Sequence, residues 1–235
     1  MKRALTFAVL AVVAVSLFGA CKSAPKDETK PAPAPAAAPA QPAAAPAGLK
    51  GPFQADADGF IRNWLFAGPF PNPGGRPEGD ENAKASCKGF AADLLKGEAA
   101  YVPKAGMEVP KEGGGTVVWK AITSDADMVD MTGLMDSTDN TVIFAACWVE
   151  IEKDADVEIR IGSDDGNKLW VDNKQVAVVH EHRAASADQD NHKMKLTAGK
   201  HLVMIKVDND WGGYSFCLRV VTADGKKVPN MKVWN

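Results

Sequence analysis

The segment from His180 to Arg183 carries two histidines at a spacing suited to metal binding. Alternate residues of a strand face the same side, so His180 and His182 would lie together and could chelate a metal ion. The chain has four histidines in all, and no third ligand stands beside this pair in the sequence. The competing interpretation, a solvated strand end, is the one that the sequence favours.

The polar loop that follows is typical of a sugar-binding site. Arg183, Asp188 and Asp190 supply guanidinium and carboxylate groups, which hold sugar hydroxyls through bidentate hydrogen bonds. Trp170 and Trp211 could offer displayed aromatic faces beside these charges. The alternative for Trp211 is a structural role, closing one end of the fold.

Motifs of known catalytic centres are absent from the sequence. There is no Gly-x-Ser-x-Gly elbow, no His-Glu-x-x-His helix and no phosphate-binding glycine loop. A hydrolase that uses Asp164, Asp165 or the His180/His182 pair is therefore the weakest hypothesis, and no catalytic residue is assigned. The formal net charge of -3 also argues against a nucleic-acid partner, which requires clustered Lys and Arg.

The sequence predicts that short β-strands position these residues. Residues 157–161 alternate apolar and charged side chains with period two, as a half-buried strand requires. Residues 169–179 predict a hairpin whose turn is Asp172-Asn173, because both residue types tolerate positive φ. Further strands are expected over 201–207 and 214–221, with one short helix over 89–99.

Many short strands separated by turn residues predict an all-β fold, an antiparallel jelly-roll β-sandwich. The region 49–235 is long enough to form it as a single domain. Three cysteines fall in this region, so at least one thiol stays unpaired and at most one disulfide forms within the chain. Cys147 and Cys217 lie in apolar strands and are expected to be buried thiols, whereas Cys87 lies in a polar segment.

Four segments, taken in order, resemble the galactose-binding-like and PA14-like jelly-roll domains that accompany extracellular bacterial glycoside hydrolases. Together they span nearly the whole region from Phe60 to Val221. The resemblance implies a β-sandwich that serves as an accessory or carbohydrate-binding module. The segments are residues 64–72, 162–172, 196–201 and 211–216.

The same resemblance implies a calcium site, because paired aspartates in such a loop help to hold calcium in some PA14-like lectins. Here the pair is Asp164-Asp165, and Asn167 and Asp172 would add oxygens if the hairpin folds back. The alternative is structural: both aspartates accept backbone N–H bonds in a tight turn, with Gly166 supplying positive φ.

The N-terminus has the pattern of an export signal. Lys2 and Arg3 precede an apolar run over residues 4–20, and small residues stand directly before Cys21. This resembles a bacterial lipobox, with Phe18 where leucine is usual, and it implies that Cys21 is acylated and becomes the mature N-terminus. An ordinary secretory signal with an unrelated cysteine is the alternative.

A change in composition after Cys21 marks a tether. Residues 31–47 contain only Pro, Ala and Gln41, which cannot bury a core and favour an extended polyproline conformation. The expected organisation is a signal peptide over 1–20, a lipidated cysteine and disordered tether over 21–48, and the sandwich over 49–235.

These observations predict an outer-membrane lipoprotein, held in the bilayer by acylated Cys21, with a non-catalytic binding domain. Carbohydrate is the first ligand hypothesis, with calcium as the one cofactor considered. The alternative is a structural or assembly role in which the domain binds a protein of the cell envelope.

Overall fold

The computed structural model describes residues 44–79 and 86–235. The predicted signal peptide, Cys21 and the tether up to residue 43 lie outside the described residues. Within the described part of the chain, no helix has the length and apolar character needed to cross a bilayer.

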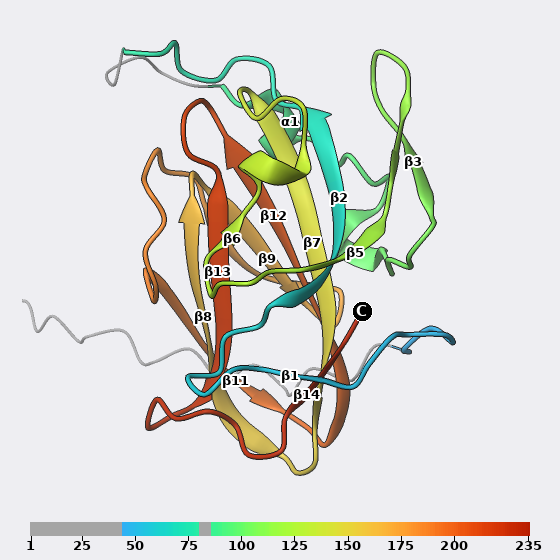
Figure 1. The fold of residues 1–235 in the computed structure, drawn as a ribbon, viewed down its shortest axis with the longest axis vertical. Helices are drawn as coiled ribbons and strands as arrows, with labels where there is room; N and C mark the ends of the chain where they lie inside the picture. The colour runs from blue at the N-terminus through green and yellow to red at the C-terminus, as the bar shows by residue number, and fades with distance from the viewer. Residues whose placement is uncertain (1–43, 80–85) are drawn as a thin grey trace, which may run out of the picture. The chain divides into compact units, whose positions relative to one another are not determined.

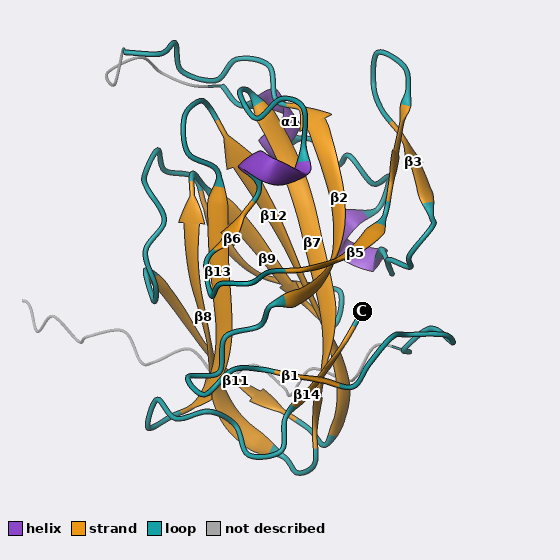
Figure 2. Cartoon of the chain, viewed as in Figure 1, coloured by secondary structure: helices purple, strands orange, loops and turns teal. Residues whose placement is uncertain are grey.

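The described chain is built from antiparallel strands, as Figures 1 and 2 show. The larger sheet has the order β1-β14-β7-β12-β9-β10, and β2 pairs with both β7 and β5. The smaller sheet has the order β11-β8-β13-β6, and β3 and β4 form a separate hairpin. Strands of the larger sheet are β1 (Phe53–Gln54), β2 (Asn63–Pro71), β5 (Lys120–Thr123), β7 (Thr141–Ile151), β9 (Asn167–Val171), β10 (Lys174–Val179), β12 (Gly199–Asn209) and β14 (Lys232–Trp234). The others are β6 (Val129–Asp130), β8 (Ala155–Asp164), β11 (Asp190–Leu196), β13 (Ser215–Thr222), β3 (Glu108–Pro110) and β4 (Thr116–Val118).

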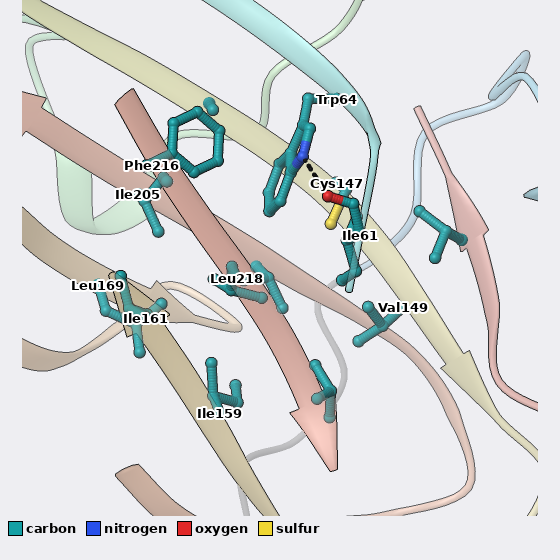
Figure 3. Close-up of a cluster of buried hydrophobic side chains, with 14 of the residues drawn as sticks. Ile61, Trp64, Cys147, Val149, Ile159, Ile161, Leu169, Ile205, Phe216 and Leu218 are labelled. Atoms are coloured by element: carbon teal, nitrogen blue, oxygen red, sulfur yellow. Dashed lines mark hydrogen bonds between the residues drawn. The ribbon is translucent and has the colours of Figure 1, made fainter. Parts of the chain in front are cut away.

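The apolar core between the two sheets follows from period-two alternation. Ile159 and Ile161 of β8 and Leu218 of β13 face Leu169 and Ile205 of the larger sheet, and all five are fully buried (Figure 3). Trp64 closes this cluster, with its indole N–H donating to the carbonyl of Ile61 over 2.9 Å. The all-β antiparallel sandwich predicted from the sequence is confirmed.

The larger sheet is buried on its outer face as well. Residues 86–119, which we call the cover segment, lie over it and form a second apolar cluster with β2, β7, β9 and β12. Phe90, Leu95 and Trp119 of the cover segment are buried there with Trp148 and Trp170 of the sheet. Strands β7 and β12 are therefore sandwiched between two apolar layers, which explains why they carry apolar residues on both faces.

Helical structure in the cover segment is shorter than predicted. The expected helix over 89–99 is split into α1 (Lys88–Ala91) and the 3-10 helix η1 (Glu98–Ala100). The break arises because the Asp93 carboxylate accepts the backbone N–H groups of Gly97 and Glu98, which competes with helical hydrogen bonding. A further 3-10 turn is η2 (Thr132–Leu134).

Two smaller predictions also have clear outcomes. The hairpin of β9 and β10 turns at Asp172 and Asn173, whose φ values of 48° and 65° confirm the predicted turn. Cys87, Cys147 and Cys217 are free and buried. Burial was expected for the two strand cysteines, but Cys87 is buried too, because the cover segment presses it onto the sheet.

Candidate binding and metal site

Three connections meet at one end of the sandwich, and we call this region the loop end (residues 164–166, 180–183 and 208–213). Asp165 joins them: its backbone N–H donates to the carbonyl of Asp208 over 2.8 Å. Its carboxylate accepts the backbone N–H of Arg183 at Oδ1 over 3.0 Å and that of Asp210 at Oδ2 over 2.8 Å. Asp165 therefore fixes the relative positions of the three connections, as the structural alternative predicted for this residue, whereas that alternative was wrong for Gly166, whose φ is not positive.

The structure gives His180 and His182 different partners. His182 Nδ1 lies 3.0 Å from Asp165 Oδ1 and 3.7 Å from Asp210 Oδ2. His180 Nε2 lies 3.5 Å from Asp208 Oδ2, and this carboxylate raises the pKa of His180. Each histidine of the predicted pair is thus matched with its own carboxylates, which the local sequence did not reveal.

Cys87 is the site residue that sequence reasoning missed. Its Sγ donates to Asp210 Oδ1 over 3.3 Å, and burial together with the neighbouring carboxylates raises the pKa of the thiol. Two groups of potential ligand atoms result, each with its atoms within 4.8 Å of one another: Cys87, His180 and Asp208 in one, Asp165, His182 and Asp210 in the other. The sequence shows Asp208 and Asp210 at alternate positions, but no residue near Cys87 in the sequence predicts that its thiol lies beside these carboxylates.

The four residues of the calcium hypothesis do not come together. Asp164 ends β8, Asp165 lies in the short connection that follows, and Asn167 begins β9. Asp172 lies at the far end of β9, where its carboxylate contacts His201 Nδ1 over 2.6 Å and accepts the backbone N–H of Leu202. Asp172 is therefore corrected to a structural partner of a buried histidine.

Asn167 has a divided role at this connection. Its Nδ2 donates to Ser163 Oγ and to Asp190 Oδ2, both over 2.9 Å. Its Oδ1 is buried and accepts no hydrogen bond from the described residues. The amide thus holds the connection in place and leaves one acceptor oxygen unused.

Asp164 stands at the rim of the loop end. Its carboxylate is half-buried and accepts no hydrogen bond from any residue that the structure describes. Burial and the adjacent Asp165 carboxylate raise the pKa of Asp164 to about 6. A Cβ atom at Gly213 would lie 2.7 Å from Asp164 Oδ2, so only glycine permits this close approach.

Trp211 lies partly exposed at the same end. Its ring centroid is 5.3 Å from that of His182, with the planes tilted by 44°. The indole N–H has no acceptor among the described residues. Trp211 therefore exposes part of its ring while its indole nitrogen is buried against the loop end.

Trp170 does not belong to this surface. It is 3 % exposed and packs in the second apolar cluster, beneath the cover segment. This corrects the expectation that Trp170 displays its ring to a ligand. Its position on β9 places it on the face of the larger sheet that the cover segment occupies.

The remaining predicted sugar-binding residues are engaged in ion pairs within the protein. Arg183 forms a bidentate pair with Asp190, with Nη1–Oδ1 at 3.1 Å and Nη2–Oδ2 at 2.5 Å. Asp188 accepts from Arg160 Nη1 over 3.0 Å and also from Arg219. Arg183 and Asp190 thus support the loop end, whereas Asp188 belongs to a charge cluster on the smaller sheet.

A pocket of about 590 Å³ lies away from these residues. It opens between α1 and the segment that joins β3 to β4, and it holds both apolar and charged side chains, including Phe70, Lys88, Asp93 and Lys111. None of the residues predicted from the sequence to bind a ligand or a metal lines it.

Comparison with known proteins places PA14 domains among the similar solved structures. The PA14 domain of the MpAFP antifreeze protein is 15 % identical, with 80 % of this chain and 92 % of that chain covered and a TM-score of 0.38. A PA14 sugar-binding domain from an RTX adhesin is 16 % identical, with 70 % and 92 % covered and a TM-score of 0.38. A β-glucosidase from Kluyveromyces marxianus is 12 % identical, with a TM-score of 0.36. The match covers 73 % of this chain but 16 % of the enzyme. No family model matches the chain. No curated protein matches it in sequence.

Proposed function

We propose that this chain is a lipid-anchored protein of the bacterial cell envelope whose sandwich binds carbohydrate without catalysis. The export signal before Cys21 and the Pro/Ala composition of residues 31–47 support the anchor and the tether. Acylation of Cys21 is tested by mass spectrometry of the protein from membranes, against the Cys21→Ser variant. A mature protein without acyl chains would contradict the anchor.

The binding proposal rests on Asp164 and Trp211, which we call the rim of the loop end. Trp211 offers a partly exposed indole ring, although its Nε1 is buried, and Asp164, whose Oδ2 lies close to Gly213, offers a half-buried carboxylate. Sugars pair an apolar ring face with hydroxyl groups, so an aromatic surface beside a free acceptor suits both features. Arg183 and Asp190 hold the supporting loop through their ion pair.

A glycan array screened with the full-length chain tests this proposal. The Trp211→Ala and Asp164→Asn variants are expected to lose at least about tenfold in affinity, because each removes a direct contact. The matched control is Trp234→Ala, since Trp234 is also partly exposed but donates to Glu150 on β7. An array without hits, or equal loss in the control, would refute the proposal. Loss on Lys88→Ala instead would place the ligand in the 590 Å³ pocket.

Calcium at Asp164 and Asp165 forms part of the same proposal. Carboxylate oxygens are the hard ligands that calcium prefers; Asp164 would supply the main contact, because both Asp165 oxygens already accept a backbone N–H and have only their second lone pairs left. Bound calcium would raise the melting temperature of the full-length chain, and chelation would lower it, with Asp164→Asn removing the effect. A melting temperature that calcium leaves unchanged would dismiss the ion from the proposal.

A protein partner in the envelope is the second candidate. The hairpin of β3 and β4 packs Val109 and Val117 against the larger sheet, while its loop projects from the fold (Figure 1), and Val118 is 47 % exposed and the neighbouring Met107 37 % exposed. Exposed apolar side chains on a projecting element suit protein contact. Crosslinking in intact envelopes, compared between the native chain and a Val118→Lys variant, tests this role.

A further inference from the structure

We infer that Cys87, His180 and Asp208 form a binding site for one Zn²⁺ ion, between the cover segment and the larger sheet. Cys87 stands at the start of the cover segment, His180 follows β10, and Asp208 lies near the end of β12. This inference goes beyond the carbohydrate proposal and does not depend on it, because it uses none of the rim residues.

The three ligand atoms already lie close together. The Cys87 sulfur, a His180 ring nitrogen and an Asp208 oxygen are all within 4.8 Å of one another, and His180 Nε2 is 3.5 Å from Asp208 Oδ2. A tetrahedral zinc ion with bonds of about 2.0 to 2.3 Å places its ligands roughly 3.3 to 3.7 Å apart. Small side-chain movements would therefore complete the coordination.

Asp208 supplies an independent sign that a cation belongs here. The residue is 1 % exposed, and its Oδ1 is buried without a hydrogen-bond partner among the described residues. From the part of the chain that the structure describes, its Oδ2 receives one long hydrogen bond of 3.4 Å, from Asn72 Nδ2, beside the His180 contact. A buried carboxylate this poorly compensated is unfavourable unless it is paired or binds a metal.

Neighbouring carboxylates add further uncompensated negative charge around Asp208. Asp165 and Asp210 are each 3 % exposed, so three carboxylates are buried at the loop end. Arg76 contributes one positive charge, with its Nε 3.8 Å from Asp210 Oδ2, and His182 Nδ1 lies 3.0 Å from Asp165 Oδ1. A divalent cation would offset the remaining negative charge.

The candidate ligands are held by a supporting shell. The His180 ring stacks on Phe90, with centroids 4.7 Å apart and planes 16° from parallel. Asn72 accepts the backbone N–H of Phe90 at its Oδ1 over 2.9 Å and donates to Asp208 through its Nδ2. One asparagine thus orients both sides of the site, as outer-shell residues of metal sites do.

The donor set favours zinc over calcium. Thiolate and imidazole are soft and intermediate ligands that select zinc and related transition metals, whereas calcium requires oxygen. The neighbouring group of Asp165, His182 and Asp210 is less suited, because both Asp165 oxygens already accept backbone N–H groups. The His180 side chain is 41 % exposed, which leaves a route for the ion to enter and a position for water.

Zinc titration of the full-length metal-free chain by calorimetry tests the site. We expect one Zn²⁺ per chain, and Co²⁺ in its place should show a thiolate-to-cobalt charge-transfer band. Cys87→Ser should abolish that band, and His180→Ala should weaken Zn²⁺ binding at least about tenfold. His180 is the safer position for substitution, because its side chain is partly exposed.

Matched controls separate ligand loss from general damage. Cys217→Ser also changes a buried free thiol, and His192→Ala also changes a histidine, but both lie outside the site. Both controls should bind Zn²⁺ as the native chain does. Absence of Zn²⁺ binding by the native chain, a cobalt spectrum without the thiolate band, or unchanged affinity in His180→Ala would each overturn the inference. Glycan binding is measured separately, so the two proposals can fail independently.

Discussion

The buried pair of Lys206 and Glu98 fastens the cover segment to the larger sheet, and its removal should show in stability. Lys206 is fully buried on β12, where its Nζ donates to Glu98 Oε1 over 2.7 Å and to the Ala92 carbonyl over 2.6 Å. Replacing Lys206 with Met preserves most of the volume but leaves the Glu98 carboxylate with the Leu94 N–H as its remaining donor. Breaking one side of a buried ion pair costs about 3–5 kcal/mol.

A double-mutant cycle isolates this interaction. We expect Lys206→Met to lower the free energy of unfolding by about 3–5 kcal/mol, while adding Glu98→Gln recovers part of the loss because no unpaired charge remains. With a urea slope of about 2 kcal/mol/M, the single variant would unfold about 2 M earlier. Tryptophan fluorescence at pH 7 follows the transition. The control is Lys193→Met, since the Lys193 side chain is 82 % exposed.

The pH dependence gives a second measure of the same pair. Burial lowers the pKa of Lys206 to about 8, against the opposing attraction of Glu98. The unfolded chain, with an ordinary lysine pKa near 10.4, then binds more protons than the folded chain between about pH 8 and 10.4. The contribution of Lys206 to stability should therefore rise with pH across that window and vanish in Lys206→Met. A variant within about 0.5 kcal/mol of the native chain at pH 7 would refute the argument.

Three further predictions concern other parts of the molecule. Burial lowers the pKa of His201, but the hydrogen bonds of its ring to Asp172 and to a backbone carbonyl outweigh burial, so the pKa is raised overall. The contribution of protonated His201 to folding stability is therefore full below about pH 6.5, the pKa of an unfolded histidine, and is lost as the pH rises through the folded pKa. Asp172→Asn should cost about 3–5 kcal/mol at pH 5 and less at pH 9, by urea unfolding; equal losses would contradict the pairing. Because the pKa of Asp164 is raised, ionisation of its carboxyl group destabilises the fold above about pH 4. Asp164→Asn should therefore stabilise the metal-free chain by about 1 kcal/mol at pH 7, a value reduced for solvent screening of this half-buried group, and should have no such effect at pH 3. A destabilised variant at pH 7 would contradict this cause. Leu218→Ala, in the core between the sheets, should cost about 2–5 kcal/mol by thermal unfolding, and a neutral result would mean that the core repacks.

The sequence predicted the strands better than the site because the two depend on different distances along the chain. Period-two alternation within β8 and the Asp172-Asn173 turn are local signals, and both predictions are confirmed. The histidine pair was also visible locally, but its carboxylate and thiol partners come from the connection after β8, from the end of β12 and the residue that follows it, and from the cover segment. Trp170 was misplaced because alternation shows which residues share a face, and not what covers that face.

The position of Cys87 was unpredictable for the same reason. Its neighbours in sequence are polar, and its burial comes from docking of the cover segment onto the larger sheet. Asn72, which links Phe90 to Asp208, likewise acts across segments that are distant in the chain. Predicting such contacts requires the tertiary arrangement, because no local pattern encodes them.

Strand β12 is buried on both faces, so a single strand register determines both the packing of the core and the positions of the polar residues. Val203, Ile205 and Val207 face the smaller sheet, while Lys206 and Asp208 face the cover segment. A slip of one residue would turn both charged groups toward the smaller sheet and turn the three apolar residues toward the cover segment. A single-residue insertion or deletion in the turn before β12 would therefore damage packing and ligand geometry together, so this turn should tolerate substitution far better than a change in length.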